Sequence, residues 1–110
     1  MGNVKGASPT ANAMLTRENI LTILRDNKDR FAEQYGVTKL GLFGSFARNE
    51  ATEESDVDIC VELAEVSYGR FFNLREEIVE KTARPVDLVR VRQGMDSLLK
   101  KRIERDAVYV

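Results

Sequence analysis

One segment constrains the fold more than any other, namely residues 56–63, DVDICVEL. Polar and apolar side chains alternate along it, which is typical of a β-strand with one buried face. The apolar members of this alternation are Val57, Ile59, Val61 and Leu63. Asp56 and Asp58 would then share the opposite face, about 6.6 Å apart. The fold must bury one side of this strand and leave two carboxylates on the other.

The rest of the pattern predicts an α/β domain in which helices back a small sheet. Thr16 is a good helix N-cap and Gly36 a good helix stop, so a helix is expected between them. Apolar periodicity and turn residues divide the remaining chain. The expected elements are helix 17–35, strand 37–43, short helix 45–50, strand 56–63, helix 69–82, strand 85–91, helix 95–106 and a short strand within 107–110.

Length and charge exclude several classes of protein. The chain has 110 residues, which suits one domain, and residues 1–13 lack any periodicity. We therefore expect a disordered leader followed by a single domain over 14–110. Seventeen basic and eighteen acidic residues give a net charge of −1. This balance argues against membrane binding and against direct nucleic-acid binding.

Cysteine and histidine usage limits the available chemistry. Cys60 is the single cysteine, so no disulfide can form within the chain, and a cytoplasmic location is expected. There is no histidine. Catalysis must therefore depend on carboxylates, hydroxyls, Lys or Arg, or this thiol. Cys60 shares the strand face of Asp58, where it could line a site or serve as a small buried filler.

The aspartate pair suggests a cation. Two carboxylates on one strand face raise each other's pKa unless a cation lies between them. Mg²⁺ prefers oxygen ligands and binds through one or two carboxylates together with substrate phosphates. A half-exposed strand with a polar outer face would also explain Asp56 and Asp58.

Asp87 interrupts the apolar run 86-VDLV-89 and is a candidate third ligand. An unpaired carboxylate on a partly buried face would be costly. If strand 85–91 lies beside 56–63, about 4.8 Å away, Asp87 can join Asp56 and Asp58 around a cation site. Three carboxylates can hold two ions about 4 Å apart, an arrangement used for phosphoryl and nucleotidyl transfer. Alternatively, Asp87 is an edge-strand residue that faces water.

Gly44 and Ser45 are candidate phosphate ligands at the end of strand 37–43. A glycine at a strand end lets the backbone approach a ligand, and the Ser45 amide and hydroxyl offer donors to an anion. Arg48 lies one turn further on and could contact phosphate or fix the turn. A surface salt bridge from Arg48 to Glu50 or Glu53 is the alternative.

Together, the motifs GSFARNE, SDVDICV and VDLV resemble the minimal nucleotidyltransferases, small relatives of kanamycin nucleotidyltransferase and the X-family DNA polymerases. The family pattern is G-S-x-A-R-G, then S-D-x-D-[LIV], then D, and the match covers about 15–110. The resemblance implies a single nucleotidyltransferase-fold domain with a small mixed sheet. Asn49 stands where the family has glycine. Asn tolerates left-handed backbone angles better than most residues, so the turn can be retained.

The resemblance also implies site residues and substrates. Asp56, Asp58 and Asp87 would be the catalytic and metal-binding carboxylates for one or two Mg²⁺ ions, with Asp87 as the general base. Gly44, Ser45 and Arg48 would bind the nucleotide, with ATP or another nucleoside triphosphate as the donor. Minimal nucleotidyltransferases commonly act as antitoxins that transfer AMP to a tyrosine of a partner HEPN-domain RNase toxin, and we adopt that as the hypothesis.

The sequence is compatible with three alternative functions. The domain could be a catalytically idle antitoxin that neutralises its partner by binding, or a nucleotidyltransferase acting on a small molecule or an RNA end. It could also be a purely structural domain. The basic helix 95–106 could bind an acidic partner, or it could be a solvated face over an apolar side made of Leu98, Leu99 and Ile103.

Overall fold

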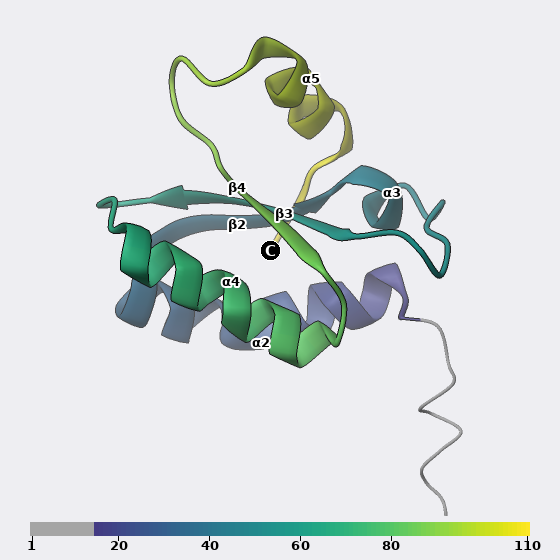
Figure 1. Ribbon diagram of the computed structural model, residues 1–110, viewed down its shortest axis with the longest axis horizontal. Helices are drawn as coiled ribbons and strands as arrows, with labels where there is room; N and C mark the ends of the chain where they lie inside the picture. Colours follow the sequence, from purple (N-terminus) through teal and green to yellow (C-terminus); the bar gives the residue numbers. More distant parts are fainter. Residues whose placement is uncertain (1–14) are drawn as a thin grey trace, which may run out of the picture.

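A four-stranded mixed sheet organises residues 15–110, which are the residues that the computed structural model describes (Figure 1). The strand order is β4-β3-β2-β5. Strand β2 runs antiparallel to both β3 and β5, whereas β3 and β4 are parallel. The strands are β2 (Val37–Phe43), β3 (Val57–Leu63), β4 (Val86–Arg90) and β5 (Val108–Tyr109). The expected mixed sheet is therefore confirmed, while the leader predicted over 1–13 lies outside the described residues.

Helices cover both faces of this sheet. The two long helices, α2 (Arg17–Tyr35) and α4 (Tyr68–Thr82), lie side by side on one face (Figure 1). The shorter α5 (Ser97–Asp106) lies over the opposite face, and α3 (Gly44–Ala47) follows β2 directly. Among residues 15–110, no helix has both the length and the apolar composition needed to cross a membrane.

The helix ends follow the sequence signals. Thr16 caps α2 through a reciprocal pair of hydrogen bonds with Asn19, each 3.1 Å long. Gly36 ends α2 with a positive φ of 73°. The last helix begins at Ser97 instead of residue 95, because the Asp96 side chain accepts a hydrogen bond from the Leu99 amide and acts as the N-cap.

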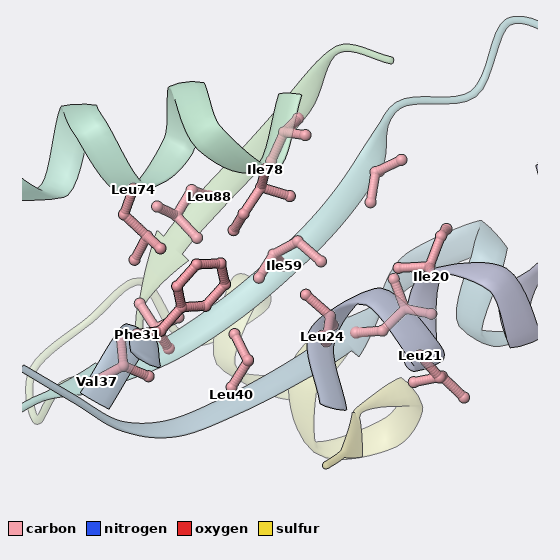
Figure 2. Packing of buried hydrophobic residues seen from close by; sticks show 14 of the residues in the cluster. Ile20, Leu21, Leu24, Phe31, Val37, Leu40, Ile59, Leu74, Ile78 and Leu88 are labelled. Carbon is pink, nitrogen blue, oxygen red and sulfur yellow. The ribbon is translucent and has the colours of Figure 1, made fainter. Parts of the chain in front are cut away.

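The main core fills the space between the sheet and the two long helices (Figure 2). Ile59 of β3 faces Leu24 of α2 and Ile78 of α4 there, and all three are fully buried. A smaller cluster of Phe43, Cys60 and Ile103 lies on the other face, under α5. Cys60 has no exposed surface, which confirms its interpretation as a small buried filler.

Apolar spacing along the sequence predicts that Phe72 belongs to the buried face of helix 69–82 and Leu98 to that of helix 95–106, but both side chains are exposed. Phe72 of α4 is 58% exposed because it lies a step around the helix from Phe71 and Leu74, which pack on the core. Leu98 of α5 is 70% exposed, since Leu99 and Ile103 alone make the apolar contacts of that helix. The expected apolar faces were therefore one residue too wide in both helices.

Candidate active site

The predicted site residues meet at one corner of the sheet, where β2 ends and where β3 and β4 begin. Phe43, the last residue of β2, pairs with Asp58 of β3. Asp58 in turn pairs with Asp87 of β4. The expected neighbouring position of the two aspartate strands is therefore confirmed, and the two carboxylates occupy matching positions. Asp56 lies immediately before β3, which begins one residue later than predicted, and is exposed.

Gly44 connects β2 to this corner and cannot be replaced by another residue without movement. Its φ is 76°, which side-chain-bearing residues rarely adopt. A Cβ atom at Gly44 would overlap Oδ2 of Asp58, so one of the two residues would have to move. The close approach expected of this glycine therefore involves the Asp58 carboxylate.

Asn49 adopts a left-handed conformation with φ of 60°. Its amide donates to the Phe46 carbonyl at 3.1 Å and closes the turn after α3. The predicted short helix therefore ends at Ala47 instead of residue 50. Among side-chain-bearing residues, Asn is one of the few that visits this region routinely, which explains how it replaces the family glycine.

Asp58 lies in an unfavourable environment for a negative charge. Its side chain is 15% exposed. Burial raises the pKa of the Asp58 carboxyl to about 6, and the neighbouring Asp87 adds to the rise, while Arg102 opposes it. A bound cation would relieve both the lost hydration and the repulsion. A cation bound at Asp58 would therefore favour the ionised form of this carboxylate, which is the form that acts as a metal ligand.

The three aspartates are not a ready-made metal cage. Within the described part of the chain, no three acidic or thiol side chains converge closely enough to enclose an ion. Asp87 is exposed on β4, which is one of the two edge strands of the sheet. Nevertheless, the donor set at this corner consists of carboxylate oxygens, which are the ligands of Mg²⁺, and substrate phosphates normally complete its coordination. The donor chemistry therefore fits Mg²⁺.

Arg48 is held by acidic side chains on two sides. Its Nη1 donates to Oδ2 of Asp106 at 2.6 Å, and its Nε donates to Oε1 of Glu50 at 3.0 Å. The alternative salt bridge to Glu50 is therefore present, whereas the second partner, Asp106, was not predicted. The side chain of Asp106 is only 1% exposed, and hydrogen bonds from Arg105 and Arg48 hold its pKa at about 2 against the effect of burial.

Two further arginines adjoin the site and were not predicted. Arg102 of α5 places Nη2 4.0 Å from Oδ2 of Asp58. Arg84 donates to the carbonyls of Thr52 and Ser55 and so fixes the segment that precedes β3. No local motif marks either residue, because only the packing of the chain brings them to this corner.

Comparison with known proteins gives matches that cover most of the chain. The family model described as "Nucleotidyltransferase domain" matches residues 22–110. The protein adenylyltransferase MntA of Thermococcus cleftensis is 41% identical over 99 residues, which cover 89% of this chain and 99% of that protein.

Solved structures share the fold. One described as a "putative minimal nucleotidyltransferase" has a TM-score of 0.70 at 26% identity and covers 87% of this chain and 97% of its own. The complex of a tri-AMPylated Shewanella oneidensis HEPN toxin with an MNT antitoxin contains a chain that matches with a TM-score of 0.55. At 22% identity over 84% of this chain and 66% of that one, this second likeness shows the fold alone. The extent of the family match and the identity to the curated relative together show that the chain belongs to the nucleotidyltransferase domain family.

Proposed function

We propose that this chain is a Mg²⁺-dependent protein adenylyltransferase that acts as an antitoxin by transferring AMP from ATP to a tyrosine hydroxyl of a HEPN-type toxin. The observation that carries the chemistry is the pairing of Asp58 with Asp87 beside Gly44. The choice of a protein acceptor is supported by the 41% identical relative, which is named a protein adenylyltransferase. We place the protein in the cytoplasm, where ATP is available and the free thiol of Cys60 stays reduced.

In this mechanism the acceptor oxygen attacks the α-phosphorus of ATP in line with the departing group. A bond forms between that oxygen and phosphorus, and the bond from the α-phosphorus to the bridging oxygen breaks. Pyrophosphate leaves with the electron pair. We assign the hydroxyl proton to Asp87, which is exposed and can therefore be reached by an acceptor.

Other residues of the corner hold the donor. Asp56, Asp58 and Asp87 are the proposed ligands of one or two Mg²⁺ ions. Bound Mg²⁺ would neutralise negative charge on the carboxylates and phosphates and orient the triphosphate. Gly44 and Ser45 are the proposed phosphate contacts, because no side chain projects from Gly44 and the next residue, Ser45, is partly exposed and carries a hydroxyl. Arg48 is proposed as a further nucleotide contact, which its partner Asp106 holds at the end of α3.

Transfer of label from ATP tests this proposal. The purified chain is incubated with α-labelled ATP, Mg²⁺ and the candidate toxin, and the labelled toxin is then digested to locate the modified residue. Asp58→Asn with Asp87→Asn should abolish transfer, because both carboxylates at the corner are lost. Asp26→Asn serves as a matched control, since Asp26 is exposed on α2 at the opposite face of the sheet and should leave transfer unchanged.

The same experiment separates the alternatives. A catalytically idle antitoxin would neutralise the toxin equally well with or without the two substitutions, and no label would be transferred. Label that appears on a small molecule or an RNA end, with none on the toxin, would support the other kind of nucleotidyltransferase. Either result contradicts protein adenylylation.

A further inference from the structure

Arg102 lies near both the candidate metal ligand Asp58 and Phe43, the residue that precedes the candidate phosphate loop. Its Nη2 is 4.0 Å from Oδ2 of Asp58, the same oxygen that excludes a side chain at Gly44. Its guanidinium carbon is 5.5 Å from the centroid of the Phe43 ring. Phe43 is fully buried and immediately precedes Gly44. Helix α5 lies over this face of the sheet (Figure 1), and these two contacts place the Arg102 guanidinium beside the loop.

The two arginines of α5 are bound very differently. Arg105 is committed to its neighbour Asp106 through two hydrogen bonds of 2.7 and 3.0 Å. The 4.0 Å separation of Arg102 from Asp58 is longer than a charge-assisted hydrogen bond, which spans about 2.7–2.9 Å. The Arg102 side chain is 48% exposed. The Phe43 ring supports the Arg102 guanidinium, and the N–H groups of this guanidinium remain accessible to a ligand.

We infer that Arg102 binds the pyrophosphate portion of the nucleotide donor, as a residue of the active site additional to the motif residues. The inference rests on the proposed function. Arg48, the other arginine that we propose to contact the nucleotide, is held by Asp106 and Glu50, whereas the acidic partner of Arg102 is 4.0 Å away. A cation bound to Asp58 would take the place of Arg102 as the partner of that carboxylate, and the Arg102 guanidinium would then be available to phosphate oxygens.

A guanidinium in this place would assist the reaction itself. Negative charge grows on the pyrophosphate as its bond to the α-phosphorus breaks. Arg can donate two parallel hydrogen bonds to phosphate oxygens, and such contacts strengthen as the charge develops. The nucleoside and the α-phosphate would bind independently of Arg102. The inference therefore predicts a selective effect on ligands that contain pyrophosphate.

Binding of two products separates this role from a structural one. The affinities of the full-length chain for inorganic pyrophosphate and for AMP are measured in the presence of Mg²⁺ by calorimetry. Arg102→Met keeps a long apolar stem and should weaken pyrophosphate binding by about 10-fold or more, since charge-assisted hydrogen bonds are lost. The affinity for AMP should change by less than about 2-fold, because AMP lacks the pyrophosphate group that forms these charge-assisted hydrogen bonds. Arg102→Lys keeps the positive charge but lacks the two parallel donors of a guanidinium. Its pyrophosphate affinity should lie between those of the wild type and Arg102→Met.

Lys101→Met is the matched control on the same helix. Lys101 is exposed and adjacent in sequence, so this variant removes the same charge without touching Asp58, and pyrophosphate affinity should stay at the wild-type value. An unchanged or tighter pyrophosphate affinity in Arg102→Met would mean that Arg102 merely shields Asp58, and this result would overturn the inference. The proposed function would still stand if the wild-type chain binds ATP and transfers AMP. A wild-type chain that binds neither ATP nor pyrophosphate would overturn both.

Discussion

Replacing Asp58 by Asn should stabilise the metal-free protein while it abolishes transfer. At pH 7.5 the Asp58 carboxylate is charged in a largely buried position, and its pKa is raised from 3.8 to about 6. A difference of this size corresponds to about 3 kcal/mol of destabilisation of the folded state. Screening by salt reduces it, so Asp58→Asn should raise the free energy of unfolding by ~1–3 kcal/mol.

The gain should depend on pH in a defined direction. The pKa of Asp58 is raised in the folded state, so the native protein binds this proton more readily than the unfolded chain does. The contribution of Asp58 to stability therefore improves as pH falls from above 6 towards 3.8. The advantage of Asp58→Asn should shrink to about a third of its value by pH 4.5 and vanish near pH 3.

Thermal unfolding with EDTA present measures this prediction. At pH 7.5 the melting temperature of Asp58→Asn should rise by on the order of 10 °C. Asp56→Asn is the control, because Asp56 is exposed and its substitution should change stability by less than ~0.5 kcal/mol. A melting temperature that is unchanged or lower at pH 7.5, or a gain that persists at pH 3, would refute the reasoning.

Three more substitutions test the geometry of the corner. Gly44→Ala should cost more than ~2 kcal/mol in urea unfolding and abolish label transfer, because of the positive φ and the contact with Asp58, while Gly69→Ala, which meets no atom within 4 Å, should be neutral or slightly stabilising. Equal effects at the two glycines would contradict this. Asp106→Asn should lower the urea midpoint of unfolding. The pKa of Asp106 is held at about 2 in the folded state, so the ionised carboxylate stabilises the fold fully above about pH 4, and this stabilisation is lost as pH falls towards 2. The wild type and the variant should therefore differ in stability at pH 7 and converge near pH 2. A pH-independent difference would show that the charge is not responsible. Asn49→Gly should stabilise by ~0.5–1 kcal/mol and Asn49→Ala should destabilise by ~1 kcal/mol, as judged by thermal melts, and the opposite order would disprove the left-handed turn.

The local signals in the sequence were sufficient for the strands and for the candidate carboxylates. Alternation along 56–63 correctly placed Asp58 and Cys60 on one face, since side-chain direction in a strand has a period of two. Helix caps at Thr16 and Gly36 were equally local. The pairing of the two aspartate strands was a conjecture from the sequence alone, because strand order depends on the path of the whole chain.

What the sequence did not reveal depends on α5. Charges on an amphipathic helix look the same whether they face water or a neighbouring element. Arg102 and Asp106 therefore read as ordinary surface residues until the packing of α5 placed one beside Asp58 and buried the other under Arg48. Phe72 and Leu98 were wrongly predicted to be buried for the same reason. Periodicity shows which side of a helix is apolar but not how many residues on that side contact the core.

The antiparallel pairing of β2 with β3 has a consequence for how such a domain can diversify. Phe43 and Asp58 are paired, so the connection between them leaves and returns to the same corner. Its segment at 53–54 is exposed and lies between two carbonyls that Arg84 holds, those of Thr52 and Ser55. Doubling the length of a flexible loop costs only about 0.6 kcal/mol. New sequence inserted there could project beside the carboxylates and select acceptors without disturbing the strands that carry the chemistry.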